Sequence, residues 1–169
     1  MSSEFNEFLA RTPFFGGLPE GSLERLALRL RPLELKRGST VFREGDQGRS
    51  MYVVQSGELL AMQAGERGKP IKLLRFLFGD FFGETTLIEM QPRPFSVIAE
   101  SDSRLLELTA QDLYALYRED IKAYVMVLQN INRELCRRLR RAGNRITEIC
   151  EQGDDEVTQI RAEGAPRKR

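Results

Sequence analysis

The stretch FFGETTLIEMQPRPFSV, residues 81–97, decides how this chain folds and what it binds. Gly83 and Glu84 open a short helical pattern, and Arg93 follows nine residues after Glu84. A glycine that opens a helix leaves backbone N–H groups free for an anion. An arginine supplies a fork of donors that fits phosphate oxygens, and a carboxylate can accept hydrogen bonds from a sugar hydroxyl. The stretch therefore predicts a pocket for a sugar phosphate; the alternative is a surface turn with scattered charges.

Length and composition indicate one globular domain with an appended element. The chain has 169 residues, of which 41% are hydrophobic and 30% charged, as is usual for a soluble protein. It contains no apolar stretch near the roughly 20 residues that a membrane span needs. The acidic N-terminal segment lacks the basic and apolar regions of a secretory signal. A cytoplasmic protein without a membrane segment is therefore predicted.

The residue types present argue against metal chemistry and catalysis. The chain contains no histidine, the commonest metal ligand and general base. Cys136 and Cys150 are too few for a tetrahedral zinc site. On one helix they would lie about 21 Å apart, so reduced thiols are expected. We therefore expect no metal site, no catalytic residues and no enzyme activity. The net charge of +1 gives the whole molecule no general attraction for nucleic acid.

The middle of the chain has the pattern of an antiparallel β-domain. Short apolar runs alternate with turn residues from Leu33 to Leu108, which is typical of a barrel or sandwich. The expected strands are Thr40–Arg43, Met51–Gln55, Glu58–Gln63, Lys69–Phe76, Phe95–Glu100 and Arg104–Leu108.

Helical patterns flank this β-region on both sides. Two short helices are expected before it, at Ser3–Ala10 and Glu20–Leu30. After it, Thr109 is placed to cap a short helix, with Asp112 at the capping-box position. A long helix is then expected from Ile121 to at least Ala142, and the pattern leaves open whether it ends, bends or frays at Gly143.

The long helix carries a wide apolar stripe. Its members follow an alternating four-three spacing that also includes Asn132, and Tyr124 and Ile131 form a second edge. One asparagine in such a seam can fix the register of a coiled coil. We expect a homodimer through residues 121–149; a helix packed only on its own barrel is the alternative. The stripe consists of Val125, Leu128, Leu135, Leu139, Ala142, Ile146 and Ile149.

These patterns divide the chain into four segments. The polar composition of the last segment predicts disorder. The segments are a helical lead-in at residues 1–31, a β-region at 32–108 that includes residues 81–97, C-terminal helices at 109–150, and a tail at 151–169.

Two motifs give the chain a resemblance to cyclic-nucleotide-binding domains. Residues 79–84 (GDFFGE), followed by Pro92-Arg93 and Ser96-Val97, resemble the phosphate-binding cassette of that family. Residues 44–57 (EGDQGRSMYVVQSG) are similar to its second strand–turn signature, and residues 13–18 (PFFGGL) to the lead-in of catabolite-activator-type regulators. The resemblance covers about residues 5–142. It implies an α+β fold: a jelly-roll-like antiparallel barrel or double-stranded β-helix, with short N-terminal helices and a long C-terminal helix.

The resemblance also implies a role for each matching residue of the cassette. Glu84 would accept a hydrogen bond from the ribose 2′-hydroxyl, and Arg93 would neutralise the cyclic phosphate. The amides of Gly83, Glu84, Thr85 or Thr86 would add donors. The implied ligand is cyclic AMP or cyclic GMP, with no other cofactor.

Further site residues follow from the same resemblance. Ser96 would offer a hydroxyl near the phosphate or the base. Leu73 is a candidate for the apolar wall against the base, and Asn144 for a donor and acceptor on the long helix. Binding in this family repositions that helix, so the implied function is a stand-alone regulatory sensor that acts on an unidentified downstream protein.

Two residues of the cassette depart from the family pattern. Pro94 stands where relatives have a residue whose N–H reaches the phosphate, and proline has no N–H. Loss of such a bond costs about 1.5–3 kcal/mol. Phe95 stands at a position that is usually alanine, and its ring either faces the core or enters the pocket. The alternative function is therefore a dimeric interaction scaffold of the same fold that no longer binds nucleotide.

The end of the chain bears on nucleic-acid binding. Related regulators carry a helix-turn-helix domain after the long helix, and residues 143–169 contain no such pattern, so specific DNA binding is not expected. The arginines between Arg133 and Arg145 are interpreted as a solvated helix face, with a nucleic-acid-binding stripe as the alternative.

Overall fold

The computed structural model describes residues 3–65 and 69–151. The chain divides into two units, residues 1–132 and residues 133–169. All the strands and the first turns of the last helix belong to the first unit, and the second unit continues that helix. The predicted tail lies outside the described residues, apart from Glu151.

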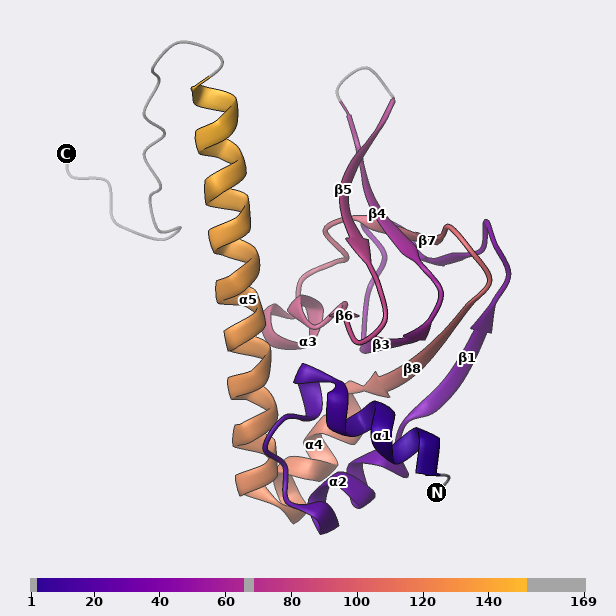
Figure 1. The fold of residues 1–169 in the computed structure, drawn as a ribbon, viewed down its shortest axis with the longest axis vertical. Coiled ribbons are helices and arrows are strands. Elements are labelled where there is room, and N and C mark those ends of the chain that lie inside the picture. Colours follow the sequence, from indigo (N-terminus) through magenta and orange to yellow (C-terminus); the bar gives the residue numbers. More distant parts are fainter. Residues whose placement is uncertain (1–2, 66–68, 152–169) are drawn as a thin grey trace, which may run out of the picture. The chain divides into compact units, whose positions relative to one another are not determined.

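The strands of the first unit form two antiparallel sheets (Figure 1). One sheet has the order β1-β8-β3-β6 and the other β2-β7-β4-β5. The α+β class and the jelly-roll-like arrangement are confirmed, although the two sheets do not close into a continuous barrel. The strands of the described part are β1 (Arg31–Leu35), β2 (Thr40–Phe42), β3 (Ser50–Ser56), β4 (Leu59–Ala64), β5 (Pro70–Phe76), β6 (Phe81–Phe82), β7 (Ser96–Ala99) and β8 (Ser103–Thr109).

All six expected strands are present, each with ends within one residue of those expected. Two observed strands were not expected. β1 contains Pro32 and two charged residues, yet it pairs along its whole length with β8. β6 has only two residues, paired with Tyr52 and Val53 of β3. Both depend on a partner strand that is distant in sequence.

Aromatic rings fill much of the space between the sheets. The Phe76 and Phe82 rings stack with their centroids 4.7 Å apart, and the Phe42 ring lies 5.9 Å from Phe82. Burial of side chains of this size supplies most of the driving force for folding. The buried cluster consists of Phe42, Tyr52, Val54, Leu59, Ala61, Phe76, Phe82, Val97 and Leu105.

Short helices gather at one end of the sheets (Figure 1). α1 (Ser3–Arg11), the 3₁₀ turn η1 (Pro13–Phe15) and α2 (Glu20–Ala27) come first, and α4 (Ala110–Glu119) follows β8. The fully buried Phe14 ring lies 5.3 Å from Phe81, which joins η1 to the core. The expected capping box is present: Thr109 and Asp112 bond reciprocally at the start of α4.

The long helix α5 (Ile121–Cys150) continues through Gly143 without a break. Within the first unit it buries Ala123, Val127 and Ile131, whereas Val125 of the expected stripe is exposed. The buried Asn130 side chain donates to Phe14 O at 3.0 Å and Gly16 O at 2.8 Å. The start of α5 is therefore attached to the N-terminal segment.

Candidate functional site

The Arg93 guanidinium is the centre of the site, and it is buried. Only 4% of the residue is exposed. One terminal nitrogen, Nη1, donates to Gly83 O at 3.1 Å and to Thr86 Oγ1 at 3.0 Å. The other, Nη2, donates to Ser50 O at 2.7 Å. The helix α3 (Thr85–Glu89) and the strand β3 thus both contribute to holding the side chain.

The backbone around Arg93 is equally well fixed. The Arg93 N–H donates to Asp46 O at 2.8 Å, and Gly45 N–H donates to Arg93 O at 2.9 Å. This pair of bonds joins the loop before β7 to the loop after β2. Two stretches that the sequence separates by almost fifty residues therefore form one side of the site.

Two glycines make room for the guanidinium. A Cβ at Gly83 would lie 2.5 Å from Arg93 Nη1, and one at Gly48 would lie 2.6 Å from Cζ. Gly83 also has a φ of +82°, a backbone angle that residues other than glycine rarely adopt. The Arg93 position therefore requires glycine at both places.

Aromatic rings cover the other side of the cation. Arg93 Cζ lies 4.0 Å from the Phe42 ring centroid and 5.9 Å from that of Tyr52. Burial lowers the pKa of Arg93 from its ordinary value, opposed by the longer-range charges of Tyr52 and Asp46. Burial likewise raises the pKa of Tyr52. The site is a low-dielectric environment in which electrostatic interactions are strong.

The acceptors around Arg93 are neutral. Among the described residues, no carboxylate lies within ion-pair distance of its guanidinium, and the buried Nε–H has no acceptor. Buried cations in proteins are usually paired with an anion. The site thus has positive charge that the described residues leave without a counter-ion in contact.

Glu84 lies at the start of α3 and is 2% exposed. Its carbonyl accepts from Leu87 N–H at 3.0 Å and from Ile88 N–H at 3.2 Å, which begins the helix. The helix ends at Met90, which has the left-handed φ of 54°. Glu84 therefore stands directly before α3, and Arg93 follows three residues after the Met90 position at which the helix ends.

A cavity of about 230 Å³ adjoins the cassette. It is somewhat smaller than the roughly 300–1,000 Å³ of typical ligand pockets. Three of the expected site residues, Thr85, Thr86 and Pro94, line it together with Glu89, Gln91 and Pro92.

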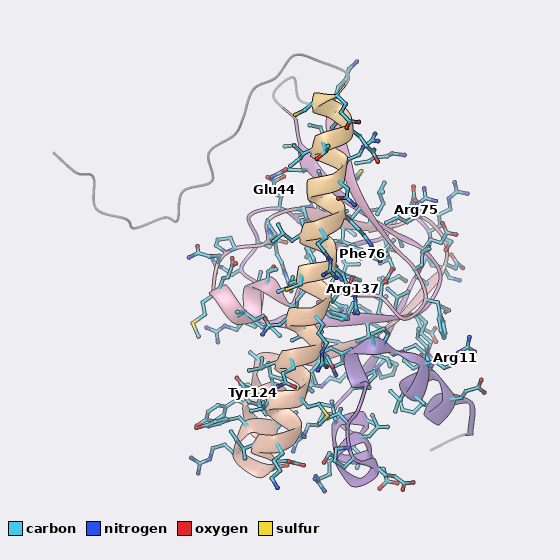
Figure 2. The ribbon with its side chains drawn as sticks, turned by 60° about the vertical axis from the view of Figure 1, so that its left-hand side comes forward. Arg11, Glu44, Arg75, Phe76, Tyr124 and Arg137 are labelled. Atoms are coloured by element: carbon cyan, nitrogen blue, oxygen red, sulfur yellow. The ribbon has the colours of Figure 1, made fainter. Side chains whose placement is uncertain are left out.

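The remaining expected site residues lie on β7, in the loop before it, on β5 and in α5. Ser96 Oγ accepts from Glu44 N–H at 3.0 Å (Glu44 is labelled in Figure 2), and Pro94 O accepts from Gln63 Nε2 at 3.4 Å. Leu73 is exposed on β5. Asn144 belongs to the second unit, so its proposed position over the base stays a prediction.

The Phe95 ring faces the core. It is partly buried against the aromatic cluster, with centroids 6.4 Å from Phe42 and 6.5 Å from Phe76. Of the two positions that the sequence left open for this ring, the structure has the one directed at the cluster.

Sequence reasoning missed Gly48, Ser50 and Phe42 as parts of the site. The residue type does not reveal these roles in the sequence. Gly48 leaves space for the guanidinium because it lacks a Cβ, Ser50 accepts through its backbone carbonyl, and Phe42 packs its ring face on the cation. The only available signal was the small size of Gly48 within the 44–57 motif.

Two other kinds of site, a membrane span and a metal centre, are not found among the described residues. None of the helices there combines the length and the apolar character that crossing a membrane requires. Residues 3–65 and 69–151 also contain no group of three or more potential metal ligands.

Comparisons with known proteins identify relatives for most of the chain. Residues 32–120 match the model of the cyclic nucleotide-binding domain. The CRP-like cAMP-activated global transcriptional regulator of Mycobacterium tuberculosis is 28% identical over 144 residues, 85% of this chain. The chain spans 62% of the length of that relative.

Solved structures agree with this match. The catabolite activator protein of Thermus thermophilus has a TM-score of 0.71 and 28% identity, over 82% of this chain and 63% of that one. A cyclic nucleotide-binding domain from Methylobacillus flagellatus has a TM-score of 0.79, over 92% of this chain and 85% of that one. Its identity of 21% makes it a likeness of fold alone.

Proposed function

The chain belongs to the cyclic nucleotide-binding domain family, and we propose that it is a regulatory module that binds a cyclic nucleotide. The Mycobacterium tuberculosis relative is named as a transcriptional regulator activated by cAMP. The proposed ligand is accordingly cyclic AMP or cyclic GMP, and the module carries out no covalent chemistry.

One observation carries the proposal: a buried arginine without a carboxylate in contact. The three hydrogen bonds of Arg93 use three of its five N–H groups and leave Nε–H and one Nη2–H. A phosphate oxygen could accept from the remaining donors and would supply the missing negative charge. Such charge-assisted bonds are about twice as strong as neutral ones.

The other cassette residues would complete the contact with the ligand. Glu84 would accept from the ribose hydroxyl, and the amides of Gly83, Thr85 and Thr86 would donate to the phosphate. Ser96 keeps its hydroxyl hydrogen available, because in the described contacts its oxygen only accepts. Leu73 and Asn144 would contact the base.

The finer parts of the proposal concern signalling and assembly. Occupancy of the site would reposition α5, and two copies would associate through the 121–149 helix. The exposed apolar residues Leu139, Ile146 and Ile149 support such an association. The module would act in the cytoplasm on a downstream protein, without specific DNA binding.

A second function is favoured by a different observation. Three protein acceptors already occupy the Arg93 guanidinium, and Pro94 offers no N–H to a phosphate. A scaffold of the same fold that has lost its ligand would show the same features. In that case the Arg93 contacts would serve only to hold α3 against β3.

Calorimetric titration separates the two functions. Wild-type protein is titrated with cyclic AMP and with cyclic GMP, each to millimolar concentration, alongside Arg93→Ala. Arg37→Ala is the matched control, because Arg37 is an exposed arginine outside the cassette. Saturable heat that Arg93→Ala abolishes and Arg37→Ala retains supports the regulatory module. Absence of heat with both nucleotides supports the scaffold.

A further inference from the structure

Three of the four tyrosines in the chain gather on one surface, where α4 meets α5. Tyr114 and Tyr117 have ring centroids 6.0 Å apart, and Tyr117 lies 5.3 Å from Tyr124. Tyr114 is 62% exposed and Tyr117 45%. Ile121, which is 52% exposed, belongs to the same stretch of chain. Figure 2 labels Tyr124 near the start of α5, at the end of the first unit away from the strands. We call Tyr114, Tyr117, Ile121 and Tyr124 the tyrosine patch.

The phenol groups of the patch are free. In the described residues, none of the three hydroxyls makes a hydrogen bond, whereas the fourth tyrosine, Tyr52, is buried and bonded to Glu107. Tyrosine is enriched at the energetic centres of interfaces because it combines a large apolar ring with a polar tip. Two exposed rings and the half-buried Tyr124 ring, joined through Tyr117, thus form a surface suited to a partner.

The charges beside the patch indicate which partner. Arg118 and Lys122 are exposed and have no ion pair with any described residue. The acids of the same stretch are occupied: Glu119 pairs with Arg29 at 2.6 Å, and Asp120 with Arg25 at 2.7 Å. This stretch therefore carries two cations and three O–H donors that have no partner among the described residues, whereas Glu119 and Asp120 already have cationic partners.

We propose that the tyrosine patch is a docking surface for an acidic segment of another protein, one with apolar side chains between its carboxylates. The rings and Ile121 would bury the apolar side chains. The carboxylates would accept from Arg118, Lys122 and the phenol hydroxyls. A parallel second copy is a poorer partner, because it would bring the same two cations against each other. The proposal does not depend on nucleotide binding.

The test uses a phage-displayed library of random peptides selected against the full chain. One enriched peptide, synthesised without Tyr or Trp, is then titrated while the protein's tyrosine fluorescence is followed. The chain contains four tyrosines and no tryptophan, and three of the four belong to the patch, so this emission reports directly on the surface.

The chain supplies a matched control. The dipeptide Ile-Lys occurs at 121–122, in the patch, and at 71–72, on β5. Ile71 is 54% exposed, almost the same as Ile121, and Lys72 is likewise exposed. The test variant is Ile121→Ala with Lys122→Glu, and the control is Ile71→Ala with Lys72→Glu.

We expect enriched peptides that combine acidic and apolar residues, and a change in fluorescence on binding. The test variant and Tyr117→Ala should each weaken binding about tenfold, and the control should not. If the double variant fails to fold by circular dichroism, Lys122→Glu alone decides. Lack of enrichment, or equal binding to wild type and variants, overturns the proposal. Self-association of the wild type that the test variant loses in sedimentation velocity also overturns it, since the patch is then an interface between copies.

Discussion

Gly48 and Arg93 are in direct contact: a side chain at residue 48 would occupy the space of the guanidinium, 2.6 Å from Cζ. The contact joins the loop after β2 to the loop before β7. Because Arg93 is also bonded to Ser50 O and Gly83 O, its position depends on the absence of a Cβ. The geometry of the proposed phosphate site is therefore sensitive to one methyl group outside the cassette.

Gly48→Ala is expected to displace Arg93 and to lower both stability and nucleotide affinity. Overpacking of this kind usually costs about 1–3 kcal/mol. Gly21→Ala is the matched control, since a Cβ at this α2 position would meet only Arg25 Nη1 at an ordinary 3.7 Å. It should stabilise the helix by roughly 0.5–1 kcal/mol. Urea unfolding compares the free energies of unfolding of the two variants. A Gly48→Ala variant as stable as the wild type would show that Arg93 is free to move.

Asn130→Ala is expected to detach α5 from the N-terminal segment. It removes the amide that donates to Phe14 O and Gly16 O. A buried carbonyl left without a hydrogen-bond donor costs about 1–3 kcal/mol. Gln129→Ala is the control on the same helix, because Gln129 is exposed and lies outside the expected dimer stripe. Thermal unfolding should show a lower Tm for the first variant only. Equal Tm values would mean that the Asn130 bonds contribute nothing.

Met90→Gly is expected to stabilise the protein. Met90 is exposed and has φ 54° at the end of α3, a conformation that costs an L-residue about 1–2 kcal/mol and glycine almost nothing. The free energy of unfolding should rise by up to about 1 kcal/mol. A decrease would indicate that the Met90 side chain makes contacts that outweigh the backbone strain.

The Asp120 carboxylate predicts a pH dependence of stability. Its pKa is lowered first by the hydrogen bond from Ser22, then by the Ala123 amide, and less by Arg25. A group with a depressed folded-state pKa stabilises the fold above its unfolded pKa, near 3.9. That contribution is lost as the pH falls through the lower, folded value. Unfolding measured from pH 6 to pH 2.5 should show a weaker dependence for Asp120→Asn than for wild type; identical profiles would contradict the coupling.

Local patterns predicted most of the secondary structure. The six expected strands and the Thr109–Asp112 capping box are confirmed. They could be predicted because turn residues, side-chain alternation and capping act over only a few residues. β1 and β6 were missed, since Pro32 and the two-residue length of β6 disguise strands that only their partners β8 and β3 stabilise. α2 ends at Ala27, earlier than the expected Leu30.

The candidate site, too, could be predicted from the sequence only in part. The sequence identified Glu84 and Arg93 through their chemistry, and both are buried in one region. It could not identify the carbonyl of Ser50, on β3, or the gap at Gly48, in the loop before β3, because both lie more than forty residues before Arg93 in the sequence. The apolar pattern of α5 also did not indicate which edge of the helix is buried. Ile131, of the second edge, is buried, whereas Val125, of the main stripe, is exposed.

The central claim is that the Arg93 guanidinium receives the ligand phosphate, and the Arg93 Nε–H resonance tests it most directly. Nitrogen-15 NMR of the full chain resolves arginine Nε–H signals, and Arg93→Lys assigns this one by its disappearance. Because Nε–H has no acceptor among the described residues, cyclic AMP or cyclic GMP should shift the resonance saturably. The Arg37 signal should stay in place. An Arg93 Nε–H resonance that remains unchanged at millimolar concentrations of both nucleotides would contradict the claim.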